Sequence, residues 1–114
     1  MKTIQLHCAG RPPLTVYNAS RYFLRLRGLI GRTLEGVDGL LLTPCAQSHT
    51  FFMRFPIDAV YLDAAGKVLH IDRAVPPGRA LGAVKGARRV LELPANEAAA
   101  RRITPGEFWK CGKD

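Results

Sequence analysis

Residues 57–74, IDAVYLDAAGKVLHIDRA, decide the fold of this chain. Side chains alternate in character along residues 57–63 and again along residues 67–74, as expected of β-strands, whose successive side chains point to opposite faces. The dipeptide Ala65-Gly66 between the two runs is typical of a turn. The stretch therefore predicts a β-hairpin.

Outward from this hairpin, Pro and Gly divide the chain into further short runs rich in β-branched and aromatic residues. These runs predict strands at 14–17, 39–43, 49–53, 88–93 and 107–110. Helices are predicted at 21–30 and 97–102, with Ser20 and Asn96 as their N-caps, and a long loop from Val75 to about Gly86. Strands and helices do not alternate regularly. The sequence thus predicts a mainly β fold, a single-domain β-sandwich or open barrel of about six to eight short strands with one or two short helices.

The length and composition limit the classes of protein. A chain of 114 residues, 47% of them hydrophobic, can form one core but not two, so residues 1–114 are predicted to be one domain. Three Cys residues are too few for a disulfide scaffold. The N-terminus has no apolar leader segment, and no apolar run is long enough to span a bilayer. We expect reduced thiols and a cytoplasmic location.

The charge balance allows either an anionic partner or simply a basic surface. Lys and Arg number 17 and Asp and Glu number 9, which gives a net charge of +8. These cations are spread along the chain, which is more typical of a basic surface than of a nucleic-acid site. The densest group, Arg21 to Arg32, supports nucleic-acid binding as an alternative hypothesis.

Residues 45–58, CAQSHTFFMRFPID, gather the groups that could carry chemistry. Ser48, His49, Arg54 and Asp58 are the candidate ligand-binding residues, because polar groups beside aromatic ones are typical of a small pocket. The candidate partners are a small anionic ligand or a protein segment. A second hypothesis is a hydrolase-type enzyme that uses Cys45, His49 and Asp58, although no complete catalytic motif is visible.

Other residues have mainly structural interpretations. Arg27 and Arg32 are candidates for a structural ion pair with Asp58 or Glu92, since a charge near a core tends to be paired. Trp109 and its neighbour Phe108 are predicted either to close the core with the last strand or to form an aromatic anchor. The His and Cys residues lack the spacing of a zinc site, so no metal or cofactor is expected.

Several segments together have a recognisable order and spacing: RGLIGR at 27–32, GLL at 39–41, HTFFMRFPID at 49–58, VLELPA at 90–95 and PGE at 105–107. In this combination the chain resembles the domain of unknown function 192 family of small bacterial and archaeal proteins. The resemblance runs from about residue 21 to residue 110. It implies a mainly β, sandwich-like domain with a helix or two, and it brings no established activity, catalytic residue or cofactor. The sequence therefore favours an uncharacterised small β-domain that binds a ligand or a protein segment.

Overall fold

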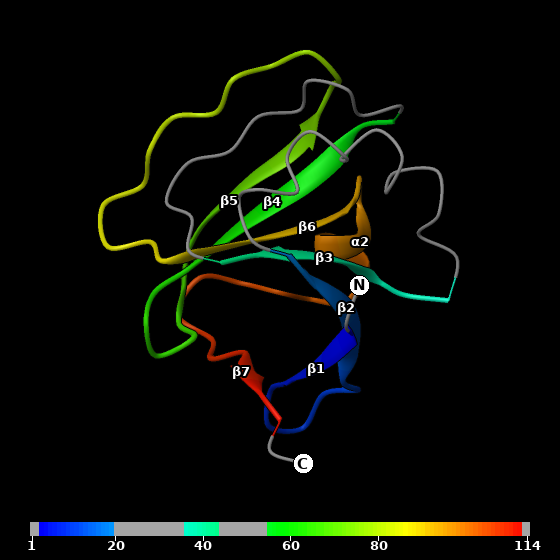
Figure 1. Cartoon of the computed structure of the whole chain (residues 1–114), viewed down its shortest axis with the longest axis vertical. Helices are drawn as coiled ribbons and strands as arrows, with labels where there is room; N and C mark the ends of the chain where they lie inside the picture. The colour runs from blue at the N-terminus through cyan, green and yellow to red at the C-terminus, as the bar shows by residue number, and fades with distance from the viewer. Residues whose placement is uncertain (1–2, 20–35, 44–54, 113–114) are drawn as a thin grey trace.

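A computed structural model of the chain describes residues 3–19, 36–43 and 55–112 (Figure 1). These residues contain seven β-strands and one short α-helix. The elements, in chain order, are β1 (Thr3–His7), β2 (Leu14–Ala19), β3 (Gly39–Leu42), β4 (Ile57–Leu62), β5 (Val68–Val75), β6 (Arg89–Pro94), α2 (Glu97–Ala100) and β7 (Lys110–Cys111).

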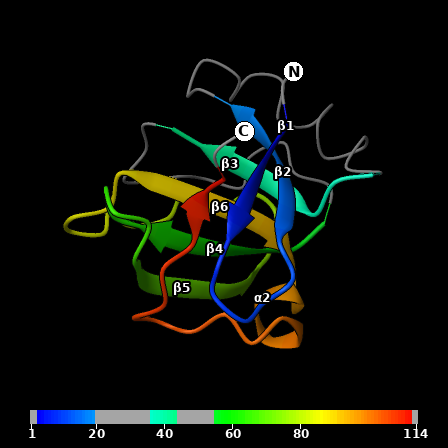
Figure 2. The ribbon, with the colours of Figure 1, turned by 90° about the horizontal axis from the view of Figure 1, so that it is seen from below.

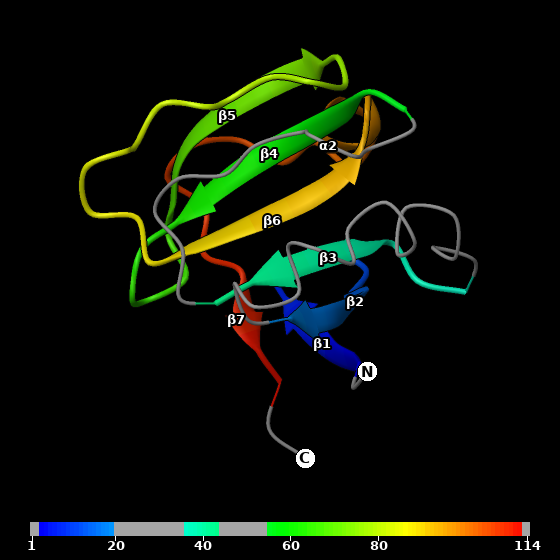
Figure 3. The ribbon, with the colours of Figure 1, turned by 45° about the horizontal axis from the view of Figure 1, so that its top comes forward.

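All seven strands belong to one sheet, in the order β5-β4-β6-β3-β2-β1-β7 (Figure 3). Neighbouring strands run antiparallel except β2 and β3, which are parallel. The sheet begins at β5 and ends at β7, so it is an open, curled sheet rather than a closed barrel. Figure 2 shows β7 beside β1, so strands from the two ends of the sequence are neighbours.

The main core lies against one face of this curled sheet and collects residues from six strands and from α2. Its members are Leu6, Leu14, Val16, Leu41, Val60, Leu62, Val68, Leu91, Leu93, Ala98, Ile103 and Trp109. A second, smaller cluster lies on the other face of β4 and β6, where Leu81 and Ala87 pack on Tyr61 and its neighbours. Since β4 is covered on both faces, all six of its residues are buried.

The mainly β architecture predicted from the sequence is confirmed. The hairpin is β4 and β5, which pair antiparallel around a turn closed by a hydrogen bond from the Gly66 N–H to the Asp63 carbonyl, at 3.0 Å. The predicted strands at 14–17, 39–43 and 88–93 are β2, β3 and β6. The predicted strand at 49–53 and the predicted helix at 21–30 lie outside the described residues. The loop after β5 is held at Leu81, which is buried.

Two predictions at the chain ends are corrected by the structure. Residues 3–7 form β1, which was not predicted, although Ile4 and Leu6 alternate there with polar residues. The last strand is β7, Lys110–Cys111, and only a single bridge between Lys67 and Phe108 lies in the predicted range before it. The physical reason is that residues 104–108 form turns and loop hydrogen bonds with the start of β5 instead of a ladder.

The predicted helix at 97–102 is shorter than expected, and its N-cap residue is Asn96, as predicted, but without the expected side-chain cap. Asn96 has a left-handed backbone (φ 76°) and its side chain makes no capping hydrogen bond. The helix ends at Ala100, and Arg102 is also left-handed (φ 57°), so the chain turns sharply there. None of the described helices is long and apolar enough to cross a membrane.

Candidate functional site

The structure describes only part of the predicted site. Cys45, Ser48, His49 and Arg54, as well as Arg27 and Arg32, lie outside the described residues. Of the candidate residues, Asp58 and Glu92 are placed, on the neighbouring strands β4 and β6. Both are buried, at 0% and 2% exposed.

Asp58 holds two pieces of backbone together. Its Oδ1 accepts the N–H of Ala74 at 2.8 Å and its Oδ2 accepts the N–H of Ala98 at 3.0 Å. The register of β4 and β5 shifts between Ile57 and Ala59, and Ala74 at the end of this bulge has a φ of 50°. A bulge leaves backbone groups out of the ladder, and the first turn of a helix leaves N–H groups without partners. Asp58 satisfies one of each, which replaces the cap expected from Asn96.

Glu92 lies on the opposite face of the sheet from Asp58. The register pairs Asp58 with Leu93 and Ala59 with Glu92, and cross-strand partners share a face while successive residues alternate. Asp58 therefore faces the main core and α2, whereas Glu92 faces the side of the second cluster. The two carboxylates do not form one site, and a single arginine cannot pair with both.

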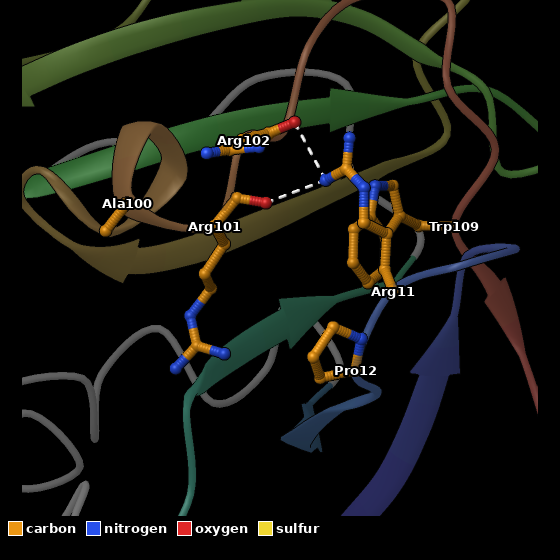
Figure 4. A pocket seen from close by; sticks show the side chains of 6 residues that line it. All are labelled: Arg11, Pro12, Ala100, Arg101, Arg102 and Trp109. Carbon is orange, nitrogen blue, oxygen red and sulfur yellow. Dashed lines mark hydrogen bonds between the residues drawn. The ribbon is translucent and has the colours of Figure 1, made fainter.

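A pocket lies at the C-terminal end of α2, opposite the end that Asp58 holds (Figure 4). It has a volume of about 270 Å³ and is lined by Arg11, Pro12, Ala100, Arg101, Arg102 and Trp109. The first two residues come from the turn between β1 and β2, the next three from the end of α2, and Trp109 from the segment before β7. Asp58 anchors the N-terminal end of the helix whose C-terminal end lines this pocket.

Arg11 forms one wall of the pocket and is fixed by three contacts. Its Nη1 donates to the carbonyls of Arg101 and Arg102, at 2.7 and 2.9 Å, and Figure 4 shows both bonds. Its Nη2 pairs with the carboxylate of Glu107, whose Oε1 accepts the N–H of Thr104 at 2.9 Å. The carbonyls after a helix have no intrahelical partner, so a guanidinium is a favourable cap for them.

Arg101 is held in a second group of charges. Its Nη2 lies 2.9 Å from Asp38 Oδ1 and 3.2 Å from Glu97 Oε1. Asp38 in turn accepts the N–H of Thr15 through Oδ2 at 2.8 Å. This network fixes the end of α2 against the beginning of β2 and shapes the pocket.

Two polar groups at the pocket lack a hydrogen-bond or ion-pair partner among the described residues. The Arg102 guanidinium has no hydrogen-bond or ion-pair partner within residues 3–19, 36–43 and 55–112. Trp109 is 1% exposed, and its buried Nε1 has no acceptor in the described part of the chain. Burying an N–H without an acceptor is unfavourable by about 1–3 kcal/mol, so such groups often mark functional positions.

Cys8 lies beside this network, and its thiol is partly buried. Burial raises the pKa of Cys8, the carboxylate of Glu107 raises it further, and the nearby Arg11 opposes the rise. At neutral pH the thiol is therefore protonated, which is the state of a structural rather than a reactive cysteine.

A third polar cluster lies on the hairpin. Asp72 accepts the hydroxyl of Tyr61 at 2.8 Å, and its other oxygen lies 2.8 Å from His70 Nε2. The His70 side chain is 52% exposed, so it is a surface residue. No cluster of three or more His, Cys, Asp or Glu residues suited to a metal ion occurs where the structure describes the chain.

The sequence drew attention to residues 45–58 and missed the pocket. Arg11 stands in Arg-Pro-Pro before a predicted strand, and Arg101 and Arg102 stand at the end of a predicted helix, and none of the three was a candidate site residue. The pocket joins residues about 90 positions apart, so no local pattern marks it. Trp109 was the one pocket residue to which the sequence drew attention, together with its neighbour Phe108. Trp109 is buried in the core, whereas Phe108 is exposed.

Comparison with known proteins is consistent with this architecture. The family described as DUF192, Uncharacterized ACR, matches residues 4–110. No curated protein matches the sequence. A crystal structure of a protein of unknown function from Novosphingobium aromaticivorans is similar, with a TM-score of 0.73 and 21% identity over 95% of this chain and 83% of that one. A "putative transcription regulator" from Sinorhizobium meliloti is similar with a TM-score of 0.76 and 24% identity, over 96% and 92% of the two chains. At these identities the likeness is one of fold.

Proposed function

The chain belongs to the DUF192 family of uncharacterised proteins, and we propose from the geometry of its pocket that it is a binding domain for a small anionic ligand. The proposed site is the pocket between Arg11, Arg102 and Trp109. The observation that carries the proposal is a pocket lined by three arginines, of which Arg102 alone has a guanidinium without a partner among the described residues.

The chemistry of the lining selects a ligand with two parts. Pro12, Ala100 and Trp109 offer apolar surface to a flat or compact body. A guanidinium binds a carboxylate or phosphate through two parallel hydrogen bonds, so Arg102 suits the anionic end. Arg11 and Arg101 add positive potential, while their own hydrogen bonds keep the pocket in shape. A pocket of about 270 Å³ suits a molecule no larger than a small aromatic acid.

The candidate residues from the sequence that the structure describes do not line the proposed pocket. Asp58 supports the pocket indirectly, because it fixes α2 through the Ala98 N–H. That Ser48, His49 and Arg54 contact a ligand stays a prediction, and so do the hydrolase-type reaction at Cys45 and His49 and the nucleic-acid site at Arg21 to Arg32.

Calorimetric titration with benzoate, inorganic phosphate and neutral benzamide tests the proposal. We expect benzoate to bind, and benzamide, which has the same ring without the charge, to bind at least tenfold more weakly. Arg102→Gln should weaken benzoate binding by a similar factor, because it removes the guanidinium without changing the pocket wall. Lys85→Gln is the charge-matched control, since Lys85 is exposed and does not line the pocket.

Three results would overturn the proposal. The first is that neither anion binds. The second is that Arg102→Gln and Lys85→Gln change binding equally, which would mean a general effect of net charge. The third is that benzamide binds as tightly as benzoate, which would make the pocket apolar in function.

A further inference from the structure

The outer face of β2, β1 and β7 is a solvent-facing surface of the sheet. In β1, Leu6 is fully buried while Thr3, Gln5 and His7 are exposed, so the strand turns its polar side outward. The register pairs His7 with the exposed Lys110, and cross-strand partners share a face. Thr15 and Tyr17 of β2 pair with Gln5 and Thr3 and extend the same face.

Phe108 and two lysines continue this surface beyond β7. Trp109 points into the core, so Phe108 on the other side of the chain points outward, where it is 44% exposed. It is the one large hydrophobic side chain exposed to this extent in the described ranges. Lys110 Nζ lies 5.5 Å from the centre of its ring, and Lys67 is its bridge partner. The Lys110 ammonium and the exposed ring are therefore presented to solvent together.

The charged side chains on this face itself are cations, and the carboxylate next to Phe108, that of Glu107, is paired with Arg11. The described residues of the outer face are Thr3, Gln5, His7, Thr15, Tyr17, Lys67, Phe108 and Lys110, and none is acidic. Asp63, in the adjacent turn, is already bonded to the N–H groups of Ala65 and Lys67.

We propose that this face binds single-stranded nucleic acid, with a base stacked on Phe108 and phosphates paired with Lys67 and Lys110. The charge complementarity points to a polyanion, and the net charge of +8 supports it. The ring distinguishes the polyanion, because every unpaired base has a π-face that can stack on an aromatic side chain. A duplex offers its bases only at the groove edges, which a broad sheet face does not enter. A protein partner would need a larger apolar area than one ring.

Fluorescence anisotropy with a labelled 15-nucleotide oligo-dT measures this binding. We expect Phe108→Ala to weaken it at least about fivefold, the lower end of what one stacked base contributes. Lys110→Gln should weaken binding and lower the slope of log K against log salt by about 0.7, as for one lost phosphate contact. Lys85→Gln, an exposed cation in the loop after β5, is the control and should change binding by less than twofold.

The proposal fails if Phe108→Ala binds the oligonucleotide like the unchanged protein, or if Lys85→Gln loses as much as Lys110→Gln. Equal affinity for the corresponding duplex would also overturn it. Phe108 is on the surface, so the variant should remain folded, and fluorescence of the buried Trp109 verifies this. Benzoate binding by Phe108→Ala separates this site from the proposed pocket, because the pocket does not include Phe108.

Discussion

Replacing Asp58 tests whether a single buried carboxylate holds the end of the hairpin to α2. Asp58→Ala leaves the N–H groups of Ala74 and Ala98 without their acceptor. The bond from Ala98 is buried and the bond from Ala74 is part-buried. A buried N–H without an acceptor is unfavourable by about 1–3 kcal/mol, so we expect the two losses together to lower the free energy of unfolding by about 3 kcal/mol. For a chain of 114 residues this corresponds to a fall in Tm of roughly 12 °C.

The chain offers a matched control at Asp63. Its Oδ1 also accepts two backbone N–H groups, those of Ala65 and Lys67, each at 2.9 Å, but in an exposed turn. Water can replace the carboxylate there, so Asp63→Ala should cost about 1 kcal/mol or less. Asp58→Asn, which keeps one acceptor oxygen, should fall between the two.

Urea unfolding followed by the fluorescence of Trp109 gives the free energies. Amide hydrogen exchange at residues 74 and 98 gives the local effect, and these two amides should lose protection first in Asp58→Ala. If Asp58→Ala is no more destabilising than Asp63→Ala, or if the two amides keep their protection, the assigned role of Asp58 is wrong.

Three further predictions concern the pocket and the turns. Arg11→Gln should lower the free energy of unfolding by about 1–2 kcal/mol, because the carbonyls after α2 and a carboxylate lose their cationic donor; an unchanged urea midpoint would contradict this. In thermal unfolding, Gly66→Ala should be more destabilising than Gly78→Ala by about 1 kcal/mol or more. Both glycines have positive φ, but a Cβ at Gly66 would clash with the backbone carbonyl of Trp109, whereas a Cβ at Gly78 would meet no atom within 4 Å. Equal losses of stability would refute this steric argument. Iodoacetamide at pH 8 should modify the exposed Cys111 faster than Cys8, because burial shields the Cys8 thiol and raises its pKa, which lowers its thiolate fraction. Peptide mass spectrometry measures both rates, and faster modification of Cys8 would contradict the prediction.

The hairpin was predictable because its information is local. Alternation along residues 57–74 and the turn at Gly66 set the strand directions without help from the rest of the chain. Ile4 and Leu6 show the same alternation in β1, but five residues are too few for the alternation to distinguish a strand from a loop. Its identity depends on β2 and β7, which it joins.

The functional geometry was less predictable because it depends on backbone groups. Asp58 looks like a catalytic or ion-pairing residue, yet its described partners are the N–H groups of two alanines, 16 and 40 positions away. Any residue except proline offers an N–H, so the sequence does not mark such partners. Arg11 is similar, since two of its three partners are carbonyl oxygens.

The pairing of β1 with β7 also bears on the order in which the chain folds. Leu6 and Cys111 are partners 105 positions apart, whereas Leu62 and Val68 in the hairpin are 6 apart. Closing the longer loop is entropically less favourable by roughly 2.5 kcal/mol, from (3/2)RT ln n. We therefore expect a nucleus of β4, β5 and β6 and a late closure of the first strand against the last. During synthesis on a ribosome, β1 would emerge well before β7, so the edge of β1 that pairs with β7 would stay uncovered until β7 has been made.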